Sequence, residues 1–355
     1  MLIAGRYEAT GAMNAGGMSE AHQCQDIRLH RQVILKTLRK EQEKRRLADE
    51  QKALLKMRSS HVVQLLDVVS FEHAGNEVRC LVLEYIDGTD LKEGQFAIGD
   101  EYLQVLWQIA KGLKEIHDAG VIHRDIKPNN LRRDKERMVK IIDFGLSREV
   151  GVDNHTQAAI GYLPYMAPEL LAKGLVEFST ATDVYAFAVV ALSISSGGLP
   201  DWCRKRVPAQ APANLCITHL AGLDAAIATS LQQCLETDPA NRPTMSEVLN
   251  SIERVLLRDR HRARVVIGGK VNELHSGKRT ATPTVSASGT VRSQLGIEYD
   301  GNDFLVRSVM GEVLANNRAL TVGSKLPPSC VLAFNVAKNN YYYATFDISN
   351  PEYMV

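Results

Sequence analysis

The stretch HRDIKPNN, residues 123–130, decides how this chain of 355 residues is interpreted. It places Asp, Lys and Asn within one short segment, and it is followed by DFG at residues 143–145 and by APE at residues 167–169. A match of three residues such as DFG occurs by chance. The order and spacing of all three motifs are what carry the interpretation.

Further charged residues extend this series on both sides. Upstream, Lys36 ends VILK and Glu50 follows in a segment of helical periodicity, and downstream Arg242 lies in DPANRPT. With these residues in order at family spacing, residues 5–258 resemble the eukaryotic-type protein kinases, most closely their bacterial Ser/Thr members. The resemblance implies phosphoryl transfer, which asks a protein mainly for positioning and for neutralisation of charge.

The resemblance implies a role for each polar residue of the central motifs. Asp125 accepts the proton of the attacking hydroxyl, and Lys127 neutralises charge on the transferring group. Asn130 and Asp143 supply oxygen ligands for Mg²⁺, a hard cation that prefers such donors. Lys36 holds the α- and β-phosphates of ATP.

The resemblance also predicts a supporting frame around these residues. Glu50 pairs with the phosphate-binding Lys on the preceding strand. Leu54, Leu65, His123 and Phe144 belong to a stacked column anchored by Asp183, and His123 is expected to be a packed residue and not a base. Further along the chain, an ion pair between the APE glutamate and the late arginine is expected, because buried charges need partners.

The nucleotide loop departs from the family pattern. NAGGMSEA, residues 14–21, places Asn14 at the first glycine position of a GxGxxGxV loop and Ser19 at the third, while Gly16 and Gly17 are retained. Asn tolerates a positive φ better than most residues, so the turn is expected to survive. The side chain of Ser19 prevents the close approach of backbone to phosphate that glycine allows, but its hydroxyl can itself bond a phosphate.

The expected adenine pocket is also altered. Ala21 and Ile34 replace the Val and Ala of the family. This exchange roughly conserves the apolar volume of the pocket roof and moves the larger side chain from the first of these positions to the second. Arg132 replaces the usual Leu of the floor, and it either stacks beneath the purine or turns outward and leaves the floor thin. In the hinge EYI, the Glu84 carbonyl and the Ile86 amide are expected to bond adenine.

The activation segment between DFG and APE leaves two questions open. Arg124 beside the catalytic Asp is typical of kinases whose segment is ordered by a phosphate. The usual acceptor position holds Ala158, so Thr156 is the nearest candidate phosphosite, against the alternative of a plain polar loop residue. Tyr162 stands where Ser/Thr kinases have Thr, although HRDIKPNN itself favours Ser/Thr substrates.

Composition excludes other function classes. Hydrophobic residues make up 45% of the chain, charged residues 23%, and the formal net charge is +1, as is ordinary for a soluble globular protein. We expect no nucleic-acid partner and no membrane partner. The apolar stretch at 184–199 is too short for a membrane span and is expected to be a buried helix. Scattered cysteines without a CxxC pair and the lack of a signal-peptide layout favour the cytoplasm.

Composition changes near residue 259. A basic linker at 259–263 leads to residues 264–355, where short β-prone runs alternate with Ser, Thr, Gly and Asn turns and predict a small all-β, sandwich-like domain. RVVIGG and DFLVRSV faintly resemble the FHA domain, which reads phosphothreonine. That module has Arg where this chain has Gly269, so a docking or dimerising role is expected, through a phosphoprotein or by self-association.

Together these observations predict an α+β protein-kinase domain at residues 1–258, with an N-lobe at about 5–86 and a C-lobe at about 87–258, followed by the β domain. The expected function is Mg²⁺- and ATP-dependent phosphorylation of Ser/Thr in protein substrates, with autophosphorylation and a regulatory or docking β domain. The alternative is a pseudokinase scaffold, favoured by the altered loop and pocket. A small-molecule kinase is disfavoured by the APE motif and Arg242.

Overall fold

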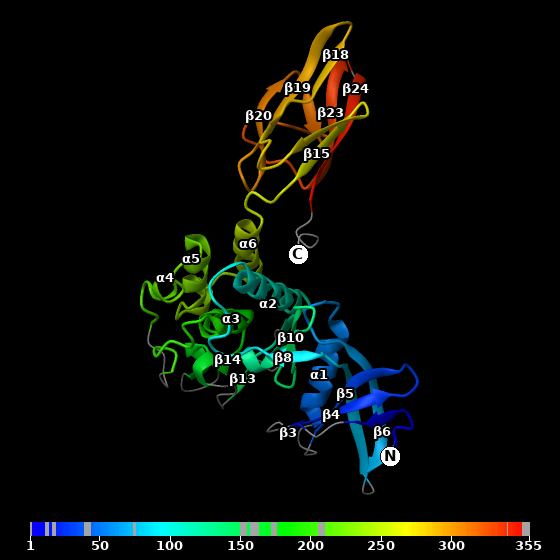
Figure 1. Cartoon of the computed structure of the whole chain (residues 1–355), viewed down its shortest axis with the longest axis vertical. Coiled ribbons are helices and arrows are strands. Elements are labelled where there is room, and N and C mark those ends of the chain that lie inside the picture. Colours follow the sequence, from blue (N-terminus) through cyan, green and yellow to red (C-terminus); the bar gives the residue numbers. More distant parts are fainter. Residues whose placement is uncertain are drawn as a thin grey trace. The chain divides into compact units, whose positions relative to one another are not determined.

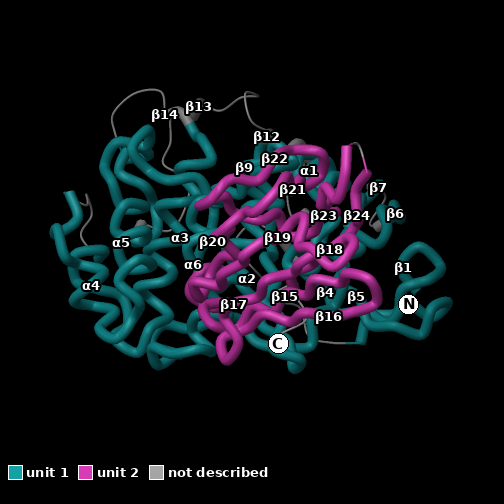
Figure 2. Tube along the Cα trace, turned by 90° about the horizontal axis from the view of Figure 1, so that it is seen from above, with its two compact units in different colours: residues 1–252 teal, residues 253–355 magenta. Residues whose placement is uncertain are grey.

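The computed structural model describes most of the chain, namely residues 2–10, 14–15, 19–38, 44–73, 76–149, 155–156, 163–171, 176–204, 210–338 and 340–349. Contacts divide it into two compact units, residues 1–252 and 253–355 (Figure 2). The domain limits expected from the sequence, at residues 258 and 264, remain a prediction.

The first unit begins with an antiparallel sheet in the order β1-β2-β4-β5-β7-β6, with β3 paired to β4. Figure 1 labels β3, β4, β5 and β6 of this sheet. Tyr7, Cys24, Val33, Leu35 and Val82 form its buried core, because alternate residues of each strand point to the same face. The strands are β1 Leu2–Ile3, β2 Tyr7–Ala9, β3 Asn14–Ala15, β4 Ser19–Asp26, β5 Arg31–Leu38, β6 Leu65–His73 and β7 Asn76–Glu84.

Helix α1, Lys44–Lys56, follows this sheet's fifth strand in sequence. Leu47, Ala53 and Leu54 are buried, whereas Leu55 is exposed, so one face of the helix packs inward. Glu50 lies on the inward face and is 1% exposed. The helical periodicity of the sequence therefore predicted correctly that Glu50 lies on a helix.

The rest of the first unit is mainly helical. The long helices α2 and α3 supply its core, and residues 184–194 of α3 are buried on every side of the helix, which confirms the expected buried helix. No helix among the described residues is long and apolar enough to cross a membrane. The helices are α2 Asp100–Asp118, α3 Thr180–Ile194, α4 Leu215–His219, α5 Ala225–Cys234 and α6 Met245–Leu256.

Short strands position the loops between the two lobes. β8 Gly88–Asp90, β10 Leu131–Asp134 and β11 Val139–Ile141 form one small sheet, in which Arg132 lies opposite Asp90. A Cβ at Gly88 would lie 1.9 Å from a neighbouring backbone oxygen, so this close approach of β8 to β10 requires glycine. The other short elements are β9 Val121–Ile122, β12 Arg148–Glu149, β13 His155–Thr156, β14 Val176–Glu177 and the 3₁₀ turns Pro128–Asn130, Leu163–Tyr165, Pro168–Leu171 and Pro239–Asn241.

Apart from the last residues of α6, 253–256, the regular elements of the second unit are all β-strands in its described residues, as the sequence predicts. One sheet has the order β16-β15-β24-β23-β21-β22, the other has β17-β19-β18 with β20 on β19, and both contribute to one core that contains Tyr299, Phe304 and Phe346. The likeness to the FHA domain is not shown. The strands are β15 Ala263–Ile267, β16 Lys270–Leu274, β17 Thr280–Ala281, β18 Thr284–Ala287, β19 Thr290–Tyr299, β20 Phe304–Met310, β21 Val313–Ala315, β22 Arg318–Ala319, β23 Ser329–Ala337 and β24 Asn340–Ile348.

Candidate active site

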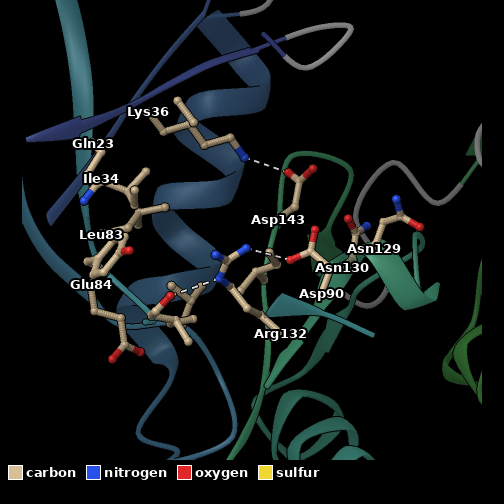
Figure 3. A pocket seen from close by; sticks show the side chains of 15 residues that line it. Gln23, Ile34, Lys36, Leu83, Glu84, Asp90, Asn129, Asn130, Arg132 and Asp143 are labelled. Carbon is tan, nitrogen blue, oxygen red and sulfur yellow. Dashed lines mark hydrogen bonds and ion pairs between the residues drawn. The ribbon is translucent and has the colours of Figure 1, made fainter. Parts of the chain in front are cut away.

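A cavity of about 410 Å³ lies between the N-terminal sheet and the loops that follow α2 (Figure 3). It brings together residues far apart in the sequence, and most of the predicted nucleotide-site residues line it. The lining residues are Ala21, Gln23, Ile34, Lys36, Val63, Leu83, Glu84, Tyr85, Ile86, Asp90, Asn129, Asn130, Arg132, Ile142 and Asp143.

Lys36 on β5 joins the two lobes at the back of this cavity. Its ammonium donates to Glu50 Oε1 on α1 at 2.7 Å and to Asp143 Oδ1 at 2.7 Å. Burial acts to lower the pKa of Lys36, but the two carboxylates outweigh it and the pKa is raised, so the ammonium stays charged. The expected pair of Lys36 with Glu50 is therefore present, and Asp143 shares it.

The catalytic-loop residues form a second cluster. Lys127 Nζ donates to Asp125 Oδ2 at 2.6 Å. The Asn130 amide nitrogen donates to the same oxygen at 2.8 Å and to the Asp125 backbone carbonyl at 2.7 Å. These bonds hold the Asp125 carboxylate in one orientation, which is what a proton acceptor for an incoming hydroxyl needs.

A buried polar frame supports this loop. Asp183 on α3 accepts hydrogen bonds from the backbone N–H groups of His123 at 2.8 Å and Arg124 at 2.9 Å. The His123 ring is fully buried, its Nε2 lies 3.2 Å from the Ile142 carbonyl, and it contacts the Phe144 ring. Burial lowers the pKa of His123, so it is a packed neutral residue, as the sequence predicts.

The donor set near Asp143 fits a hard divalent cation. Partial desolvation raises the pKa of Asp143, but the charge and hydrogen bond of Lys36 bring it down to about 2, so the carboxylate stays ionised. Asn130 uses its amide nitrogen for Asp125, which leaves the amide oxygen as its ligand atom. Carboxylate and amide oxygen are ligands that Mg²⁺ prefers, and both residues line the same cavity.

Arg132 does not turn outward. Its guanidinium lies in the cavity wall, where Nε donates to the Ile86 carbonyl at 3.0 Å, one terminal nitrogen to Asp90 Oδ1 at 2.7 Å and the other to the Gly88 carbonyl at 2.7 Å (Figure 3). All three nitrogen atoms are therefore bound to the hinge segment. These bonds use three of the five N–H groups and fix the planar group in the cavity wall.

The hinge is held from its other side as well. The Glu84 carboxylate accepts two hydrogen bonds from Lys140 at 2.8 and 3.0 Å and one from the Gln64 backbone at 2.8 Å. Sequence reasoning assigned only the backbone of Glu84 a role, and it missed Asp90 and Lys140 altogether. No motif marks these partners, because β8 and β11 bring them together only through strand pairing with β10.

Several predicted residues lie partly or wholly outside the described residues. Gly16, Gly17 and Tyr162 are outside them. Ser19 begins β4 and Thr156 ends β13, and in both cases it is the backbone that the structure places. Their predicted roles at the phosphates and in the activation segment remain predictions.

Arg242 and Glu169 form the ion pair expected from the sequence. The two terminal guanidinium nitrogens donate to Glu169 Oε1 at 2.8 Å and Oε2 at 2.7 Å, and the Arg242 side chain is 0% exposed. The remaining donors reach the backbone carbonyls of Ala181 and Glu236. This bidentate pair ties the APE segment to the start of α3 and to the turn before α6.

Arg124 differs from Arg242 in that part of its guanidinium group is left without hydrogen-bond partners among the described residues. It is 8% exposed, its guanidinium packs over the Phe178 ring, and its Nε and one terminal nitrogen are buried without a hydrogen-bond partner in the part of the chain that the structure describes. Burial and the nearby charge of Arg148 lower its pKa to about 10. A buried cation with unused donors favours an incoming anion.

Comparison with known proteins agrees with this geometry. The family model of the protein kinase domain matches residues 7–252, so the chain belongs to the protein kinase family. It is 27% identical over 277 residues to a probable serine/threonine-protein kinase of Clostridium perfringens, covering 72% of this chain and 39% of that protein. It is 30% identical over 210 residues to the serine/threonine-protein kinase PrkC of Bacillus subtilis, covering 56% and 31%.

A third relative is the serine/threonine-protein kinase PknB of Mycobacterium tuberculosis, 27% identical over 278 residues, which cover 71% of this chain and 43% of that protein. The chain thus spans between about a third and two fifths of the length of the curated relatives it matches. These matches support the bacterial Ser/Thr class read from HRDIKPNN.

Proposed function

We propose that this protein transfers the γ-phosphate of ATP to Ser or Thr hydroxyls of protein substrates. The observation that carries the proposal is the arrangement of the polar residues: Asn130 and Asp143 line the cavity whose back is closed by the Lys36 ion pairs. Asn130 also bonds Asp125, which in turn holds Lys127. Asp125 and Asp143 serve phosphoryl transfer, and a chain that had lost this reaction would have no chemical need to keep both in register.

Each residue has a defined task in this reaction. Asp125 orients the substrate hydroxyl and accepts its proton as the oxygen bonds to the γ-phosphorus and the bond to the ADP oxygen breaks. Lys127 neutralises charge on the transferring group, and Lys36 does the same at the α- and β-phosphates. Asn130 and Asp143 would hold Mg²⁺, which supplies further charge neutralisation when bound.

The proposal is tested by incubating the full chain with Mg²⁺ and ATP and mapping the phosphate by intact mass and peptide sequencing. Phosphate on Ser or Thr of the chain or of an added protein supports the proposed activity. Phosphate on Tyr alone would contradict the proposed Ser/Thr preference, and Tyr162→Thr would then test whether that position sets it. Bound nucleotide without any transfer would support the scaffold alternative.

Two guanidinium nitrogens of Arg124 are buried without a hydrogen-bond partner among the described residues, which supports a second proposal, that a phosphate on Thr156 orders the activation segment. We expect Thr156→Ala to lower the rate of transfer to an added protein by about tenfold, because one or two charge-assisted hydrogen bonds are lost. The measurement compares initial rates of wild type and variant after preincubation with ATP. Thr290→Ala, in the β domain, is the matched control, and equal rates for all three proteins would reject the proposal.

We further propose that Arg132 forms the floor on which the adenine ring stacks. Arg132→Leu restores the usual apolar floor but removes the fixed guanidinium, and we expect nucleotide affinity to fall by about three- to tenfold. A fluorescent ATP analogue titrated against both proteins measures this directly. The control is Arg133→Leu. Arg133 is the next residue of the same strand, does not line the cavity and bonds Glu101 instead. Unchanged affinity in Arg132→Leu would contradict stacking.

For the C-terminal unit we propose regulation or substrate docking, through a phosphoprotein or by self-association. What supports this is a complete two-sheet core, which makes the unit a structured module and not a tail. Analytical ultracentrifugation of the full chain, with and without prior autophosphorylation, tests the self-association arm.

A further inference from the structure

A second cavity, of about 560 Å³, opens beside the catalytic loop. Pro128, Asn129 and Tyr165 line one part of it, and the segment 88–93 after the hinge lines the rest. We call it the acceptor groove. It shares Asp90, Asn129 and Arg132, all labelled in Figure 3, with the nucleotide cavity. A protein segment that brings a hydroxyl to Asp125 from this side would pass along it.

The two carboxylates that line the acceptor groove are already engaged. Asp90 Oδ1 accepts from Arg132 at 2.7 Å. Glu93 Oε1 accepts from the Leu199 backbone at 2.9 Å and also binds the guanidinium of Arg204. Each negative charge of the groove therefore has an arginine partner supplied by the protein itself.

Lys92 is the charged residue of the acceptor groove that has not yet been assigned a partner. It lies between these two acidic positions on the groove wall, it is exposed, and its ammonium has no carboxylate partner among the described residues. With Asp90 and Glu93 balanced by Arg132 and Arg204, the side chains at the groove leave one positive charge unbalanced. An electrostatic field of this sign favours an acidic residue and disfavours a basic one.

We propose that the acceptor groove selects protein substrates with an acidic residue near the phosphorylated Ser or Thr and rejects those with Arg or Lys there. This inference rests on the proposed kinase function and names its substrate class. Arg132 has two roles in this inference: it is the proposed floor of the nucleotide cavity, and it also neutralises the charge of Asp90 in the acceptor groove. An arginine at this position thus changes the charge of the neighbouring groove, which an apolar residue cannot do.

The test uses short fluorescein-labelled peptides with a central Ser in an Ala/Gly background, each carrying a single Glu or a single Arg at one flanking position. Binding to the full-length Asp125→Asn protein is measured by anisotropy without ATP, so that the peptides are not phosphorylated. At one flanking position we expect the Glu peptide to bind about fivefold tighter than the Arg peptide. Lys92→Glu in the same background should reverse this order.

Two further variants separate the groove from general surface charge. Lys52→Glu reverses an exposed charge on α1, away from the groove, and should leave the preference unchanged. Arg132→Leu frees Asp90 and should raise the affinity of the Arg peptide. A double variant Arg132→Leu/Asp90→Asn should lose that gain, because the carboxylate that attracts the Arg peptide is then absent.

Equal binding of Glu and Arg peptides at every position, or tighter binding of Arg peptides by the otherwise unchanged protein, would overturn the inference. So would a preference that Lys92→Glu leaves in place. These outcomes are independent of catalysis, since they are read by binding. Failure of the proposed function would show itself differently, as absence of phosphate transfer by the wild type in the presence of Mg²⁺ and ATP.

Discussion

Asp125→Asn should lower the rate of phosphate transfer by about 10²- to 10⁴-fold, because it removes the proton acceptor and leaves an amide of almost the same shape. The carboxylate is held by Lys127 at 2.6 Å and by Asn130 at 2.8 Å, so its position is set before a substrate arrives. The measurement is transfer of labelled phosphate from ATP to an added protein and to the chain itself.

The control for this variant is Asp118→Asn, which makes the same chemical change at a side chain that is 61% exposed on α2. It should keep the wild-type rate. Nucleotide affinity of Asp125→Asn should also stay near that of wild type, since the residue is assigned to the hydroxyl and not to the base. Transfer at the wild-type rate by Asp125→Asn would contradict the assigned role, and weak transfer by all three proteins would favour the scaffold alternative.

The second large effect is expected on stability. Arg242→Met should lower the free energy of unfolding by about 3–5 kcal/mol, because it leaves the Glu169 carboxylate without the partner that compensates its desolvation. The lost contacts include both bonds to Glu169, at 2.8 and 2.7 Å, and bonds to backbone carbonyls. Urea unfolding of wild type and variant, followed by far-UV circular dichroism, gives the difference.

Two other variants show whether the pair itself is responsible. Arg133→Met removes an ion pair whose acidic partner, Glu101, is 52% exposed, and it should cost no more than about 1 kcal/mol. The double variant Arg242→Met/Glu169→Leu removes both charges and should recover part of the loss. An unfolding midpoint of Arg242→Met equal to that of wild type would show that the pair does not support the C-lobe.

Much of the fold could be predicted from local patterns. The periodicity at residues 44–57 located α1 and placed Glu50 on its buried face, and the apolar stretch at 184–199 located most of α3. Alternating short runs after residue 264 identified an all-β unit. These predictions succeeded because side-chain periodicity reports which face of an element is buried.

The partners of the hinge could not be predicted in this way. Sequence reasoning left two orientations open for Arg132, and the bound one was found only because strand pairing places Asp90 opposite it and brings the carbonyls of Ile86 and Gly88 within reach. Such contacts join segments more than forty residues apart and depend on register. A one-residue shift in register would turn the side chain to the other face of the strand.

What the sequence by itself determined about this protein is its family and the residues proposed to carry phosphoryl transfer, since Asp125, Asn130 and Asp143 sit in motifs whose spacing is set by local chain geometry. What only the tertiary structure decided is how Arg132 is used, and with it the charge of the acceptor groove. The reason is physical: a motif constrains neighbours along the chain, whereas the electrostatics of a wall depend on which distant charges the fold places within hydrogen-bond distance.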